Sequence, residues 1–135
     1  MGQVFVDTNV FLRHLLQDHP RQSPRATRFL ARVEDGELEA HLSDTIVLEM
    51  VYTLQRTYRQ SKTAIRDVVL PIIELQGMIL PGKRRYRRVF DLYVERNISF
   101  ADAYHVVLMG QLDVNEIMSF DRDFDRCPEV KRLQP

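Results

Sequence analysis

The fold is decided near the start of the chain, by the stretch Val4-Phe5-Val6-Asp7-Thr8-Asn9-Val10. Three apolar residues followed directly by an acid predict a short buried strand that ends at Asp7. Apolar residues then recur at helical spacing as far as Leu16, which predicts a helix over residues 10–16. A short strand that leads through a polar turn into a helix is typical of an α/β domain.

Strands and helices alternate in the same way along the rest of the chain. Further short strands are predicted at residues 38–42, 78–80 and 116–120, with one more in the tail from Glu129. Helices are predicted at residues 25–33, 45–59, 62–76, 83–96 and 100–112, with serine N-caps at Ser23, Ser43, Ser61 and Ser99 and a disturbance at Pro71. We therefore expect one domain over residues 1–135, a three-layer α/β/α sandwich with a short, mainly parallel central sheet.

Composition excludes several classes of protein. The chain has 135 residues, of which 44% are hydrophobic and 28% charged, so it is neither disordered nor of low complexity. Its 19 basic and 19 acidic residues cancel, unlike the charge of a basic nucleic-acid coat. With no apolar run of membrane-spanning length, no secretory signal and a single cysteine, we expect a cytoplasmic protein with no membrane partner.

Four acidic residues stand at positions that suit a metal site. Asp7 and Asp121 each follow a predicted strand, and the carboxyl ends of parallel strands share one edge of a sheet. Glu49 and Asp102 lie in otherwise apolar helices, where a carboxylate is costly unless it is paired. Converging carboxylates repel one another unless a hard cation such as Mg²⁺ or Mn²⁺ neutralises them. Such ions support phosphodiester hydrolysis.

Each acid also has a simpler explanation. Asp7 would serve as a helix N-cap, and Asp102 would complete a capping box with Ser99. Glu49 would pair with an arginine, and Asp121 would belong to a solvated acidic loop. These explanations are reasonable one at a time, but four acids at two strand ends and two helix starts favour a shared role.

The four segments around these acids resemble the PIN domain family, and in particular the VapC-type toxins of bacterial toxin–antitoxin pairs. The resemblance covers nearly the whole chain, and the segments occur in the family's order. They are Val4-Phe5-Val6-Asp7-Thr8-Asn9-Val10, Ser43-Asp44-Thr45-Ile46-Val47-Leu48-Glu49, Ser99-Phe100-Ala101-Asp102-Ala103 and Ser119-Phe120-Asp121-Arg122-Asp123-Phe124. The resemblance implies a metal-dependent endoribonuclease that uses Mg²⁺ or Mn²⁺.

The resemblance also assigns roles to individual residues. It makes Asp7, Glu49, Asp102 and Asp121 the catalytic acids, with Asp7 and Asp102 holding the metal and Glu49 and Asp121 acting directly or through water. Asp123 is the alternative to Asp121. The supporting polar residues are Thr8 and Asn9, which would orient Asp7, and Ser119, which precedes the last acid. The implied partners are an RNA substrate, a cognate antitoxin that inserts a segment into the active-site groove, and a second copy in a homodimer.

The densest basic run is Lys83-Arg84-Arg85-Tyr86-Arg87-Arg88. Arg84, Arg85 and Arg88 would hold RNA phosphates or an acidic antitoxin segment, and Tyr86 would stack on a base. The simpler alternative is a solvated helix start. Arg13 and Arg25 are further candidates for facing the same groove.

Two other functions are compatible with parts of the pattern. A non-catalytic RNA- or protein-binding module would keep the same fold without needing a metal. A phosphatase that forms an aspartyl-phosphate would use Asp7 as the nucleophile. In that mechanism an acid transfers a proton two residues further on, where this chain has Asn9.

Overall fold

The computed structural model describes residues 2–135 and consists of two compact units. The first ends at Arg84 and the second spans Arg85–Pro135. Each unit combines helices with a small parallel sheet, which confirms the α/β fold class and the mainly parallel pairing.

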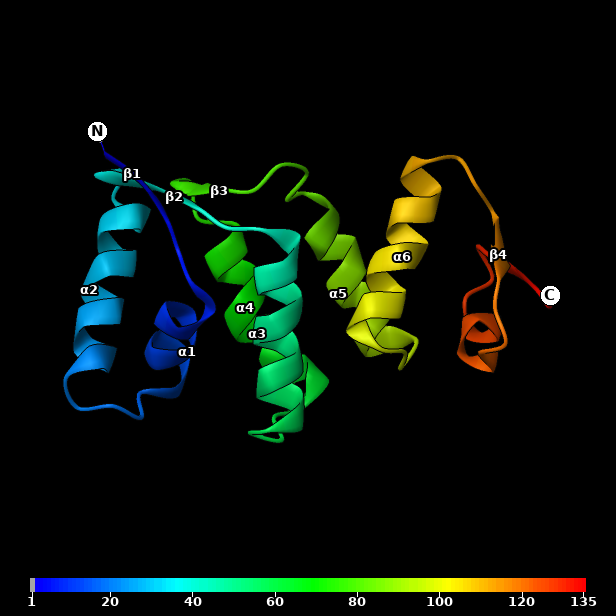
Figure 1. The fold of residues 1–135 in the computed structure, drawn as a ribbon, viewed down its shortest axis with the longest axis horizontal. Coiled ribbons are helices and arrows are strands. Elements are labelled where there is room, and N and C mark those ends of the chain that lie inside the picture. Colours follow the sequence, from blue (N-terminus) through cyan, green and yellow to red (C-terminus); the bar gives the residue numbers. More distant parts are fainter. Residues whose placement is uncertain (1) are drawn as a thin grey trace. The chain divides into compact units, whose positions relative to one another are not determined.

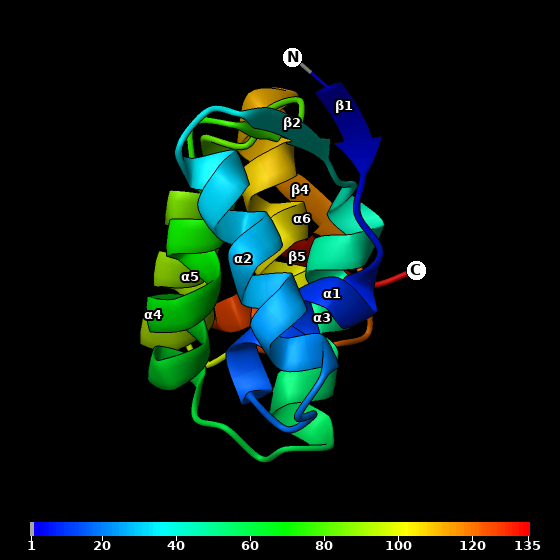
Figure 2. The same ribbon diagram turned by 90° about the vertical axis from the view of Figure 1, so that its left-hand side faces the viewer.

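The sheet of the first unit has three parallel strands. They are β1 (Gly2–Phe5), β2 (Leu38–His41) and β3 (Met78–Ile79), in the order β1-β2-β3. The register pairs Val4 with Ala40 and Ala40 with Met78. Figure 2 shows β1 running beside β2 at one edge of this sheet.

Four helices complete the first unit: α1 (Thr8–Leu16), α2 (Gln22–Glu34), α3 (Asp44–Arg56) and α4 (Lys62–Ile73). In Figure 1, α1 lies beside α2, and α3 lies beside α4. Apolar side chains at helical spacing form the core, and Phe11, Val47 and Leu54 are fully buried. The predicted caps Ser43 and Ser61 are confirmed, because their hydroxyls accept hydrogen bonds from the backbone N–H groups of the first turns.

The second unit contains α5 (Arg85–Glu95), α6 (Phe100–Gln111), a short 3₁₀-helix η1 (Arg122–Arg126) and the parallel strands β4 (Glu116–Met118) and β5 (Lys131–Leu133). Aromatic rings join its two long helices. Phe100 lies 4.8 Å from Phe90 and 5.3 Å from Tyr93, measured between ring centroids. These contacts anchor the first turn of α6, where Asp102 lies.

Four details of the sequence prediction are wrong. Of the three residues predicted as a buried strand before Asp7, only Val6 is buried: Val4 is 39% and Phe5 66% exposed, because β1 lies at the edge of its sheet. Ser23 does not cap its helix, which begins at Gln22, and its hydroxyl accepts from the backbone N–H of His19 instead. The helix that contains Pro71 ends at Ile73 and not at residue 76, and the acidic stretch after β4 is a 3₁₀-helix rather than an open loop.

None of the helices in the part of the chain that the structure describes combines the length and apolar character needed to cross a membrane.

Candidate functional site

Asp7 stands where the first strand passes into α1. It occupies the N-cap position with an extended backbone, but its side chain accepts no capping hydrogen bond. The carboxylate is exposed to solvent. Helix capping therefore does not account for an acid at this position, and its oxygens are available to a ligand.

Glu49 is held by a buried neighbour from another helix. The hydroxyl of Thr8, in the first turn of α1, donates a 3.0 Å hydrogen bond to Oε2 of Glu49 on α3. Thr8 is only 2% exposed, so this hydroxyl has little access to water. Within residues 2–84 Glu49 forms no ion pair, so no arginine described in the first unit pairs with it. Thr8 thus orients the carboxylate of Glu49.

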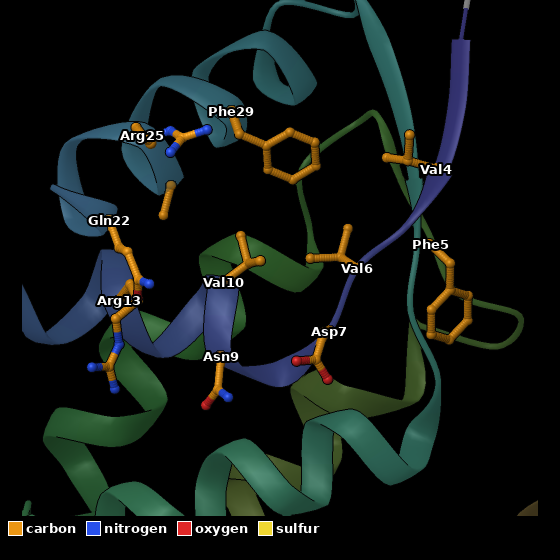
Figure 3. A pocket seen from close by; sticks show the side chains of 11 residues that line it. Val4, Phe5, Val6, Asp7, Asn9, Val10, Arg13, Gln22, Arg25 and Phe29 are labelled. Atoms are coloured by element: carbon orange, nitrogen blue, oxygen red, sulfur yellow. The ribbon is translucent and has the colours of Figure 1, made fainter. Parts of the chain in front are cut away.

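A pocket of about 610 Å³ opens beside Asp7 in the first unit. Figure 3 shows Asp7 and Asn9 on one side of it, apolar side chains of β1 and α2 around it, and Arg13 and Arg25 further along. Its volume is in the range of pockets that bind small ligands, about 300–1,000 Å³. Both arginines named as candidates for the groove therefore line the same pocket as Asp7.

The second unit brings three carboxylates together. Oxygen atoms of Asp102, Asp121 and Asp123 lie within 4.8 Å of one another. Asp102 and Asp123 are half-buried and Asp121 is exposed, so the cluster faces solvent on one side. Several carboxylate oxygens in one place form the donor set that Mg²⁺ and Mn²⁺ prefer. The residues of this cluster therefore fit a divalent ion.

Hydroxyl and carboxylate caps shape this cluster. Ser99 is the N-cap of α6, and its hydroxyl accepts from the backbone N–H of Asp102 at 3.1 Å, which is one half of the predicted capping box. Ser119 accepts from the N–H of Asp121 at 2.9 Å. Oδ1 of Asp121 in turn accepts from the N–H of Asp123 at 2.9 Å. This second bond turns the chain so that both acids join Asp102.

Burial raises the pKa of the Asp102 carboxyl above its usual value, and the nearby carboxylates of Asp121 and Asp123 raise it further. A hydrogen bond from Ser99 and the nearby His105 work in the opposite direction. Both raising effects arise from a negative charge that is poorly solvated and close to other negative charges. A bound cation would offset both effects.

Asp121 and Asp123 are alternatives in the family pattern, but the structure places both in the cluster. The sequence does carry a signal that both acids lie together. They are two residues apart, a spacing at which the side chain of the first aspartate accepts a hydrogen bond from the backbone N–H of the second in a tight turn. Asp125, the third acid of this segment, pairs with Arg132 and lies outside the cluster. Asp7 and Glu49 belong to the first unit and Asp102, Asp121 and Asp123 to the second.

Two arginines of the basic run have partners within the second unit. Arg85 donates to the hydroxyl of Tyr104 at 2.7 Å, and Arg88 pairs with Glu129 at 3.1 Å. Tyr86 is fully buried against Phe100 and Tyr104, so the prediction that it stacks on a base is wrong.

Among the three arginines predicted for RNA, Arg84 and Arg88 are exposed, and Arg84 ends the first unit.

Comparison with known proteins adds three curated relatives. The chain is 29% identical to "VapC ribonuclease Mb1869c" of Mycobacterium bovis and to "Ribonuclease VapC13" of Mycobacterium tuberculosis, over 96% of this chain and 98% of each relative. It is 25% identical to "VapC ribonuclease" of Aquifex aeolicus, over 90% of this chain and 89% of the relative. Residues 4–130 match the PIN domain family, and this range includes all five acids described above. The chain therefore belongs to the PIN domain family.

Proposed function

We propose that this chain is a metal-dependent endoribonuclease that hydrolyses RNA phosphodiester bonds as the toxin of a toxin–antitoxin pair. The observation that carries the proposal is the cluster of Asp102, Asp121 and Asp123 in a PIN-family chain. The relatives named as VapC ribonucleases support the choice of RNA as the substrate. PIN nucleases generally use divalent metal ions, and we propose Mg²⁺ or Mn²⁺ here.

The metal would be held by the acids. In this proposal Asp102, Asp121 and Asp123 of the second unit supply carboxylate oxygens to the ion, and Asp7 and Glu49 are the catalytic acids of the first unit. When bound, a divalent ion supplies a Lewis acid for the phosphate and lowers the pKa of water towards neutrality. The acids would hold the ion in place, so that the approaching phosphate meets a neutralised rather than a repelling surface.

The polar neighbours give the acids fixed orientations. Thr8 holds the carboxylate of Glu49 from a buried position, and Ser119 and Ser99 fix the backbone that presents Asp121 and Asp102. Asn9 lines the pocket beside Asp7 and is proposed to contact the substrate there. Side chains that are oriented before the substrate arrives lower the cost of reaching the reactive geometry.

RNA and the antitoxin would use the cations near these acids. Arg13 and Arg25 line the pocket beside Asp7, where they would hold phosphates on either side of the cleaved bond. Arg84 is an exposed further contact. The same arginines would accept acidic side chains of an antitoxin. Assembly as a homodimer and action in the cytoplasm complete the proposal by resemblance to VapC toxins.

The direct test is an RNA cleavage assay on the purified chain with total bacterial RNA and Mn²⁺. We expect defined fragments with 5′-phosphate ends, and an Asp7→Asn variant that cleaves at least about a hundredfold more slowly, since metal-assisted steps supply several kcal/mol. Asp35→Asn is the matched control, an exposed aspartate of the same unit at the end of α2. RNA that is bound but never cleaved, with affinity unchanged in Asp7→Asn, would identify a non-catalytic binding module instead.

Replacing Thr8 by valine tests the role of its hydrogen bond. Thr8→Val keeps the size of the buried side chain but leaves Glu49 without its donor. A hydrogen bond to a charged group contributes about 1.5–3 kcal/mol, so we expect cleavage to slow by about tenfold or more. Initial rates measured with Thr8→Ser as the control would check this, because serine restores the hydroxyl. Equal rates for the valine variant and the wild type contradict the assignment.

A further inference from the structure

Arg132 ties together the two ends of the segment that carries Asp121 and Asp123. It lies on β5, where it pairs in register with Ile117 of β4, and its side chain is only 11% exposed. Its Nε and Nη2 donate to the two carboxylate oxygens of Asp125 at 3.0 and 3.3 Å. Its Nη1 donates to the backbone carbonyl of Ser119 at 3.2 Å. One guanidinium therefore binds the start and the end of residues 119–125.

The segment between these two points has few other anchors. Phe124 is buried, and the caps of Ser119 and Asp121 act only on the turn itself. Asp121 is exposed and Asp123 is half-buried, so neither acid is held in place by packing. Three carboxylates within 4.8 Å also repel one another and tend to spread the segment apart. A two-point tie from a nearly buried cation opposes that spreading.

We propose that Arg132 is a positioning residue for the metal site: it holds Asp121 and Asp123 at the separation from Asp102 that a divalent ion requires, without contacting the ion. The proposal rests on the metal site of the proposed function. Bidentate arginine–carboxylate pairs are strong and geometrically specific, so the pair can hold the segment that carries the metal ligands in one conformation. Residues that orient metal ligands from outside typically change metal affinity by about 10- to 100-fold when they are removed.

Replacing Arg126 is expected to change Mn²⁺ affinity in the opposite direction from replacing Arg132. It pairs directly with Asp123 at 3.5 Å, and both side chains are about half exposed. As a cation on a ligand it competes with the metal, so Arg126→Gln should leave Mn²⁺ affinity unchanged or make it tighter. Loss of the tie in Arg132→Gln should make it weaker. If the only effect were the loss of positive charge near the acids, Mn²⁺ affinity would change in the same direction in both variants.

The experiment is a calorimetric Mn²⁺ titration of the full chain without RNA. We expect a Kd about 10- to 100-fold higher for Arg132→Gln, a smaller rise for Arg132→Lys, and no change for Arg32→Gln, which loses an exposed pair with Glu37 in the first unit. At saturating Mn²⁺, cleavage by Arg132→Gln should recover towards the wild-type rate. Wild-type affinity in a folded Arg132→Gln variant overturns the proposal.

A second variant and one wild-type result complete this test. If Arg132→Gln does not fold, Asp125→Asn is measured in its place. This variant weakens the pair between Arg132 and residue 125 and leaves the bond to the carbonyl of Ser119. Its Mn²⁺ Kd should also rise. An unchanged Kd in Asp125→Asn would then overturn the proposal. A wild-type chain that binds Mn²⁺ but cleaves no RNA contradicts the proposed ribonuclease function and leaves the comparison of arginine variants in force.

Discussion

Removing divalent metal should abolish RNA cleavage by this chain. The carboxylates of Asp102, Asp121 and Asp123 lie within 4.8 Å of one another, and without a cation their negative charge repels the negative phosphate of RNA. A metal also supplies several kcal/mol of stabilisation as the phosphate reacts. Together these effects predict a loss of at least about a thousandfold in rate when EDTA is in excess over the ion.

The measurement is the initial rate of RNA fragmentation after dialysis against EDTA, followed by stepwise return of Mn²⁺ or Mg²⁺. Activity should return with the free ion concentration and reach half of its maximum near the Kd found by direct titration. Zn²⁺-free buffers and a metal-independent ribonuclease run in parallel exclude effects of EDTA on the RNA itself. Full cleavage in EDTA would contradict the proposed function.

Most of the secondary structure follows from local patterns in the sequence. Period-3.6 apolar spacing with a serine before it predicted α3, α4 and α6, and their N-caps Ser43, Ser61 and Ser99 are confirmed. These signals work because a helix end has unpaired N–H groups that a neighbouring hydroxyl satisfies. The exposure of β1 could not be predicted in this way, because edge position depends on which strands pair and not on local composition.

The acids were found from the sequence, but their partners were not. A carboxylate in an apolar stretch is unusual enough to mark Glu49 and Asp102. Nothing in the sequence connects Thr8 with Glu49, 41 residues away, or Arg132 with the carbonyl of Ser119. Those contacts arise from tertiary packing, and a family motif records the residue types without recording which side chain each one contacts. Tyr86 illustrates the same limit, since its position in a basic run does not indicate that its ring is buried against Phe100.

Replacing Asp102 by asparagine should separate function from stability. The backbone N–H of Asp102, which caps α6 through Ser99, is unaffected by this change. The variant removes one of three mutually repelling carboxylates, so the metal-free protein should unfold at the same temperature as the wild type or higher. Mn²⁺ affinity and cleavage should both collapse, with cleavage falling by about a hundred- to thousandfold.

Thermal unfolding with and without Mn²⁺ measures both effects in one series. An ion that binds only the folded state raises the unfolding temperature, so the wild type should gain stability with Mn²⁺ and Asp102→Asn should not. Asp91→Asn is the matched control, since Asp91 is a half-buried aspartate of the same unit that lies outside the acidic cluster. It should keep both the Mn²⁺ shift and the cleavage rate. If Asp102→Asn kept the Mn²⁺-induced rise in unfolding temperature and the cleavage rate, Asp102 would not be a metal ligand. The three acids would then be solvated surface groups that bind no ion.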